Sequence, residues 1–132
     1  MSVAFLNPPA LARPGSYSHV AIVPAGRQVH LSGQVALDTA GALVGRGDLA
    51  AQAAQVFTNI HNAMAAVDLP ITAVFKLTLY VVDLTPERAD IVRAARAAAF
   101  GAGPYPAATM IGVSALVDPD LLIEVEAIAF AD

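Results

Sequence analysis

Residues 48–82 constrain the fold most, because a helical period there gives way directly to a strand period. Apolar side chains recur on one helical face over residues 48–67, Asp48 can cap the N-terminus, and Pro70 marks the end. Residues 73–82 (AVFKLTLYVV) then alternate between apolar and polar positions, as a half-buried strand does. A helix with one apolar stripe followed by a strand with one apolar face predicts a helix packed on a sheet.

The flanking segments extend this pattern in both directions. Thr85-Pro86-Glu87 is typical of a helix start, and Gly101 suits the C-terminal cap of a helix that ends near Phe100. A turn at residues 24–26 would join the first two strands as a hairpin. The expected strands are 17–23, 28–34, 73–82, 107–116 and 121–130, with a further short strand at 42–44.

The resulting order is β-β-α-β-α-β-β in one domain, residues 1–132. We therefore expect an α+β fold with two helices on one face of a mixed sheet. The other sheet face is half apolar and needs a cover. The chain is 57% hydrophobic and only 14% charged, so a second subunit is the simplest cover, and we expect an oligomer.

Composition excludes several classes of function. The chain has no cysteine, which rules out disulfides, thiolate metal sites and a cysteine nucleophile. Its net charge is −4 and its seven cations are dispersed, so nucleic-acid binding is not expected. Arg88, Arg93 and Arg96 are interpreted as a solvated helix face. No run could span a bilayer, and Pro8 and Pro9 break the start, which is not a signal peptide; the expected location is cytoplasmic.

Two carboxylates on the last strand are the most informative polar residues. Glu124 and Glu126 share a face with Leu122, Ile128 and Phe130. Acids on an otherwise apolar face indicate either a general base that handles water or an ion pair with an arginine at an interface. Both alternatives stay open from the residues alone, with Glu124 the stronger candidate.

Other candidate groups give weaker signals. Ser32 and Gly33 end the second strand, where glycine would let a ligand approach the backbone and serine could donate a hydrogen bond, but a plain strand end fits equally well. The three histidines have no ligand spacing, so no metal site is expected. No phosphate loop or dinucleotide fingerprint is present.

Four stretches together resemble one family. These are SGQ at 32–34, VFKLTLYVVDL at 74–84, YPAATM at 105–110 and IEVEAIA at 123–129, and they resemble the YjgF/RidA (L-PSP endoribonuclease) family across nearly the whole chain. The resemblance implies a chorismate-mutase-like fold and a homotrimer with ligand clefts between subunits. It also implies hydrolysis of reactive imines and enamines, such as 2-aminoacrylate, without cofactor or metal.

The resemblance also implies a set of site residues. Tyr17 and Ser32 would line the cleft, and Glu124 would position the attacking water. The arginine that grips the substrate carboxylate in typical members falls on Ala108, and a common cysteine falls on Met110. With Thr109 between them, these positions form a wall without a charged group, so weak activity on 2-aminoacrylate and an uncharged or apolar ligand are expected.

Three functions fit these observations. The first is a divergent enzyme that acts on a small imine, enamine or carbonyl compound without the usual carboxylate anchor. The second is a non-catalytic trimer that binds small metabolites as a sensor or scavenger. The third, an endoribonuclease or translation inhibitor, is disfavoured by the acidic charge.

Overall fold

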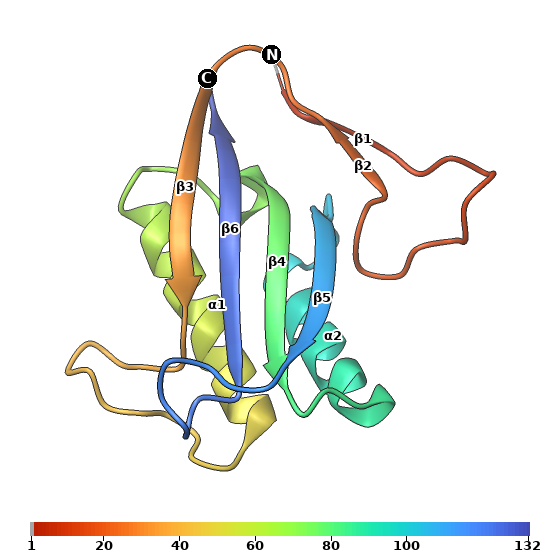
Figure 1. Ribbon diagram of the computed structural model, residues 1–132. Helices are drawn as coiled ribbons and strands as arrows, with labels where there is room; N and C mark the ends of the chain where they lie inside the picture. Colours follow the sequence, from red (N-terminus) through yellow and green to blue (C-terminus); the bar gives the residue numbers. More distant parts are fainter. Residues whose placement is uncertain (1) are drawn as a thin grey trace.

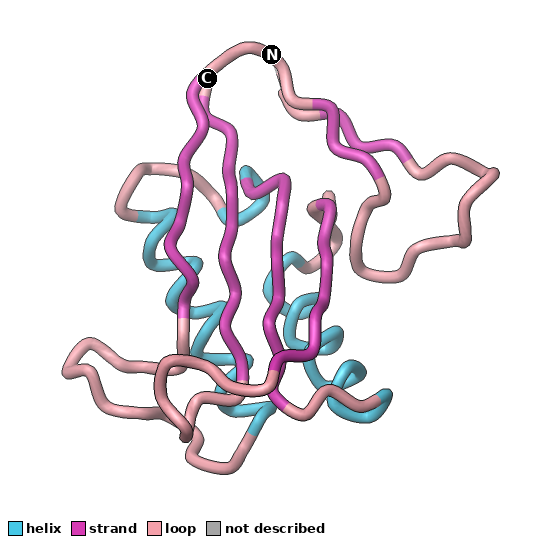
Figure 2. The backbone as a smooth tube through the Cα atoms, viewed as in Figure 1, coloured by secondary structure: helices cyan, strands magenta, loops and turns pink. Residues whose placement is uncertain are grey.

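The computed structural model describes residues 2–132, and its main body is a four-stranded sheet with two helices behind it (Figure 1). Figure 1 views the sheet from the face that carries no helix, called the open face below. Figure 2 shows the loops that lead into α1 and β6 at one end of the strands and the chain termini at the other. The body consists of β3 (Arg27–Gln34), α1 (Leu49–Ala65), a 3-10 turn (Ile71–Ala73), β4 (Val74–Val82), α2 (Pro86–Phe100), β5 (Ala107–Val113) and β6 (Ile123–Ala131).

The sheet is mixed, with strand order β3-β6-β4-β5. β6 runs antiparallel to β3 and β4, whereas β4 and β5 are parallel because α2 connects them as a crossover. The alternating apolar residues of β4 and β6 are buried against the helices, together with Val56, Ile60 and Met64 of α1. The expected α+β architecture, with two helices on one face of a mixed sheet, is confirmed.

Helix ends follow the predicted capping chemistry. The Asp48 side chain accepts a hydrogen bond from Ala51 N at 3.0 Å, and the Thr85 hydroxyl accepts one from Arg88 N at 3.2 Å. Gly101 caps α2 with φ of 56°, a conformation that glycine adopts without strain. The first helix ends at Ala65, two residues before the predicted end.

The predicted hairpin of residues 17–23 and 28–34 is wrong. The strand β2 is only Val20–Ile22, and it pairs with β1 (Ala4–Leu6), a strand that the sequence did not reveal. A Cβ at Gly26 would lie 2.7 Å from Cζ of the Phe130 ring. The turn before β3 therefore packs on β6, and β3 runs antiparallel beside that strand. The β1–β2 hairpin and its loop, called the arm, project from the sheet (Figure 1).

Smaller differences occur at other ends. The expected strand at 42–44 is a single bridge between Leu37 and Leu43. The predicted strand 107–116 ends at Val113, and the last strand is 123–131 instead of 121–130.

One buried glutamine ties the loops at the end of the sheet to α1. Gln52 has no exposed surface; its Nε2 donates to the carbonyls of Gly45 and Asp120, and its Oε1 accepts from Leu122 N. All three partners lie in loops that lead into α1 or β6. Gln52 therefore fixes the chain at Leu122, directly before β6 begins and two residues before Glu124.

Candidate functional site

The strand register arranges polar side chains in rows across the open face. Glu124 of β6 pairs with Tyr80 of β4, which pairs with Ile111 of β5. The next row holds Glu126, Thr78 and Thr109. The two carboxylates therefore lie on a face that no helix covers, as the alternation of β6 predicted.

Glu124 lies directly against the backbone of Gly33. A Cβ at Gly33 would be 2.7 Å from Cδ of Glu124, closer than any real contact, so only glycine leaves room for this side chain. The Glu124 carboxylate is partly buried and has no hydrogen-bond or ion-pair partner among residues 2–132. The structure thus brings together two of the residues that the sequence singled out and leaves the carboxylate available to a ligand or a partner.

Glu126 differs from Glu124 because it has a partner. The Tyr80 hydroxyl donates to Oε1 of Glu126 at 2.8 Å. This hydrogen bond raises the pKa of Tyr80, and burial and the charges of Glu126 and Glu124 raise it further. In the same region of the sheet, Lys76 Nζ donates to Thr109 Oγ1 at 3.1 Å.

Ser32 lies where β3 departs from regular pairing with β6. The register shifts between Leu31 and Gln34, which places an extra residue in β3 beside Glu126 and Glu124. The Ser32 side chain is exposed and its hydroxyl has no hydrogen-bond partner among the described residues. The bulge brings Gly33 against Glu124, so the SGQ segment is more than a plain strand end.

Ala108 and Met110 lie on the helix side of the sheet, opposite to the face that carries Glu124. They pair with Leu77 and Leu79 of β4, which point toward the helices, and both pack against the core. Thr109 between them is on the open face. Side-chain alternation along β5 is the reason, since neighbouring residues of a strand point to opposite faces.

Tyr17 lies at the far edge of the sheet, beside β5. Ser18 forms a parallel bridge with Ala107, its amide donates to the Pro106 carbonyl at 3.0 Å, and its hydroxyl donates to the Tyr105 carbonyl at 2.6 Å. The segment that carries Tyr17 is thereby held along β5.

An arginine that the sequence analysis set aside lies beneath Tyr17. Arg96 is only 4% exposed, and its guanidinium lies 5.8 Å from the centre of the Tyr17 ring. Its Nε and Nη2 atoms both donate to the Ser16 hydroxyl. Burial, followed by the charge of Arg93, lowers the pKa of Arg96, which the charge of Tyr17 partly offsets. No carboxylate pairs with it among residues 2–132.

The interpretation of the three α2 arginines as a solvated face is therefore wrong for Arg96. Arg88 also uses its side chain internally, donating to the Val82 carbonyl. Only Arg93 is exposed and paired with an exposed acid, Asp90. The sequence of α2 does not indicate which of its three arginines is buried. The residues that cover Arg96, Ser16 and Tyr17, come from a distant part of the chain.

The predicted site residues fall into two groups that β4 separates. Glu124, Gly33 and Ser32 lie on β6 and β3, whereas Thr109 and Tyr17 lie on or beyond β5. Neighbouring strands are about 4.8 Å apart, so β6 is roughly 10 Å from β5 and roughly 14 Å from the Tyr17 segment. One small ligand cannot contact both groups within a single chain.

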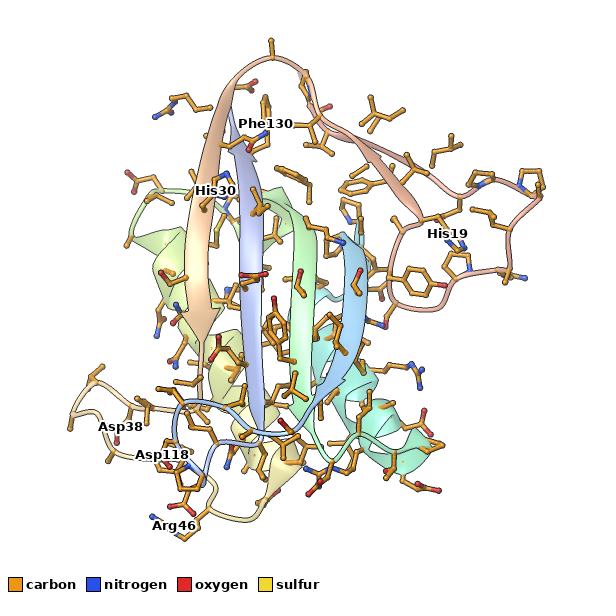
Figure 3. All side chains as sticks on the ribbon, viewed as in Figure 1. His19, His30, Asp38, Arg46, Asp118 and Phe130 are labelled. Atoms are coloured by element: carbon orange, nitrogen blue, oxygen red, sulfur yellow. The ribbon has the colours of Figure 1, made fainter. Side chains whose placement is uncertain are left out.

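The histidines are dispersed over the molecule. Figure 3 shows His19 on the arm and His30 on β3, at opposite edges of the view. His19 Nε2 lies 2.6 Å from the Ala12 carbonyl, and His30 Nε2 lies 3.0 Å from Gln28 Oε1. Over residues 2–132, no group of three His, Asp or Glu residues is arranged to hold a metal ion. No helix in this range is long and apolar enough to cross a membrane.

Comparison with known proteins places this fold and sequence in one family. The family described as Endoribonuclease L-PSP matches residues 8–131, and the chain belongs to this family, the YjgF/RidA or Rid family. Protein DfrA of Myxococcus xanthus is 34% identical over 116 residues, which cover 87% of this chain and 85% of DfrA. The resemblance read from four short stretches is confirmed.

Two solved structures show how the fold compares. YyfB of Yersinia pestis, described as a Rid-family protein of unknown function, is 34% identical with a TM-score of 0.95, covering 99% of this chain and 100% of YyfB. RidA of an Antarctic Psychrobacter is 30% identical with a TM-score of 0.72, covering 91% and 92% of the two chains. The likeness to both extends over nearly the whole chain.

Proposed function

We propose that this protein is a divergent Rid-type hydrolase, deaminase-like in its chemistry, which acts on a small imine, enamine or carbonyl metabolite. The observation that carries the proposal is the partly buried, unpartnered Glu124 carboxylate held against Gly33 on the open face. A carboxylate that lacks an internal partner is free to accept a proton from water.

The proposed reaction is the hydrolysis of a carbon–nitrogen double bond. Glu124 accepts a proton from water as the water oxygen bonds to the imine carbon, and it passes this proton to the nitrogen to give an amino alcohol. Glu124 then takes the proton of the hydroxyl and delivers it to the nitrogen, so the carbon–nitrogen bond breaks, ammonia leaves and the carbon–oxygen double bond forms. One imine and one water thus become one carbonyl compound and one ammonia, with no oxidant or reductant.

The proposed assembly is a homotrimer with a cleft between neighbouring copies. Two observations support it: the open face bears apolar residues beside its carboxylates, and the two groups of site residues are too far apart within one chain. In a trimer, Glu124 of one copy could meet Tyr17 of the next. Sedimentation equilibrium at micromolar concentration should give a trimer; a monomer at that concentration would contradict this assembly.

Glu124→Gln tests the proposed activity, with Glu126→Gln as its matched control. Ammonia release would be followed for a panel of small imines and enamines generated in solution, with and without a carboxylate. We expect Glu124→Gln to lose at least about a hundred-fold in turnover, as removal of a general base does. Glu126→Gln can still accept from Tyr80 and should stay within a few-fold of the wild type.

The same panel separates the enzyme from a binding protein. If no compound is turned over faster than by buffer while calorimetry still detects binding, the chain is a non-catalytic metabolite-binding protein and the proposal fails. Equal loss in both glutamine variants would also contradict the separate role of Glu124.

A further inference from the structure

A cavity of about 570 Å³ lies between the loop of the arm and the turn that enters β5. Its walls are largely apolar, with Phe5, Leu11 and Pro104 among them, and the rings of Tyr17 and Tyr105 also line it. Such a mixture of apolar walls and a few polar groups is typical of small-molecule sites.

The charged lining of this cavity is positive. Among the described residues that line it, Arg13 is the only one with a charged side chain, and none is Asp or Glu. The Arg13 guanidinium is exposed and has no hydrogen-bond or ion-pair partner among residues 2–132. The second cation, Arg96, is buried beneath Tyr17 without an acid to neutralise it. Arg13 in the lining and Arg96 beneath the Tyr17 ring both lack an acid partner among residues 2–132, so the potential at the cavity is positive and favours an anion.

The loop that forms the cavity is held in place by its own hydrogen bonds. His19 N donates to Asn7 Oδ1 at 2.7 Å, and the His19 ring bonds the Ala12 carbonyl. On the opposite wall, the Tyr105 hydroxyl donates to the Gly101 carbonyl at 2.6 Å, which fixes its ring. The cavity is thus braced on both sides, which lowers the ordering cost of binding.

We propose that this cavity binds a small monocarboxylate with an apolar body, and that Arg13 is its carboxylate-binding residue. The inference rests on the proposed function, because Tyr17 belongs to both sites. Ala108 cannot bind an anion, so Arg13 supplies the guanidinium from the arm. Planar guanidinium groups pair with carboxylates through two parallel hydrogen bonds, which a neutral amide cannot match.

Calorimetric titration with phenylacetate and its neutral counterpart phenylacetamide tests this site. The wild type should bind phenylacetate at least ten-fold more tightly than phenylacetamide. Arg13→Gln should weaken phenylacetate binding roughly ten- to hundred-fold and leave phenylacetamide almost unchanged. Arg93→Gln, which removes the same charge from an exposed ion pair, is the control and should leave both affinities unchanged.

The outcomes distinguish this inference from the proposed activity. Calorimetry detects phenylacetate binding whether or not the protein turns over an imine, so the loss of affinity in Arg13→Gln tests this site even if the proposed activity is absent. Arg13→Lys keeps the charge but loses the planar pairing, and should bind with intermediate affinity. Equal phenylacetate affinity in the wild type and in Arg13→Gln, or equal losses in Arg13→Gln and Arg93→Gln, would overturn the assignment.

Discussion

The middle of the open face and the arm beside β5 carry opposite charges, and neither charge has a partner among residues 2–132. Glu124 is a free carboxylate on a rigid central strand, whereas Arg13 is a free guanidinium on a loop. The first is positioned by a close backbone contact with Gly33, and the second lies on a loop that the hydrogen bonds of His19 to Asn7 and Ala12 hold in place. The contrast suggests two half-sites, one for water and one for an anion, that become complete only between copies.

The largest expected effect comes from removing the hydrogen bonds of Gln52, which hold the chain just before Glu124. Gln52→Leu should lower the free energy of unfolding by about 2–4 kcal/mol, because it removes three hydrogen bonds and leaves the Leu122 amide and the Asp120 carbonyl without this partner. Chemical denaturation measures this change. Gln55→Leu, on the same helix but bonded only to Asn59, should change stability by less than about 1 kcal/mol. Similar losses of stability in both variants would show that the hydrogen bonds of Gln52 contribute no more than the one of Gln55.

A smaller and more local effect is expected from Gly33→Ala. The added methyl overlaps Glu124, so the carboxylate must move while the fold persists, and turnover should fall about ten-fold. Glu124→Asp shortens the side chain, and the double variant should lose less than the sum of the two single losses. Steady-state kinetics on all four proteins measures this coupling. Additive losses would mean that Gly33 does not position Glu124.

Removing the Arg96 guanidinium beneath Tyr17 should weaken ligand binding without a large loss of stability. Arg96→Met removes an uncompensated buried charge, so it should cost less than about 1 kcal/mol of stability or even increase it. Loss of the contacts to Ser16 and the Tyr17 ring should still weaken phenylacetate binding several-fold. Denaturation and calorimetry on one preparation test both parts. A large loss of stability with unchanged binding would make Arg96 purely structural.

The smallest effect concerns the hydrogen bond that distinguishes the two carboxylates. Because Glu126 raises the pKa of Tyr80, this phenol should ionise at higher pH than an ordinary tyrosine. Removing the negative charge in Glu126→Gln should shift its titration to lower pH. Ultraviolet difference titration of each protein against its Tyr80→Phe counterpart isolates this residue. An unshifted curve in Glu126→Gln would contradict the assigned cause.

The part of the fold set by periodicity could be predicted, and the part set by distant contacts could not. The faces of β4 and β6 and the caps at Asp48 and Thr85 follow from local spacing, and all agree with the structure. The arm could not be predicted, because β1 has three residues and its paired residues in β2 lie 14 to 18 positions away along the chain.

The candidate site shows the same division. Glu124 and Gly33 were each a candidate in the sequence and lie together in the structure, yet no local pattern reveals that a side chain fills the space above that glycine. Ala108 was expected to face the ligand with Glu124, and only the pairing with Leu77 shows that it points to the other side. The burial of Arg96 depends on a loop about eighty residues earlier in the sequence.

The central claim, that the two half-sites meet between copies, is tested most directly by subunit complementation. Glu124→Gln and an Arg13→Gln/Tyr17→Phe variant would be unfolded, mixed in equal amounts and refolded, with each variant refolded alone as a control. Random assembly of cyclic trimers should restore an intact cleft at about a quarter of the interfaces, so roughly a quarter of the wild-type turnover of a carboxylate-bearing imine should return. A mixture no more active than the two variants alone would contradict the shared site.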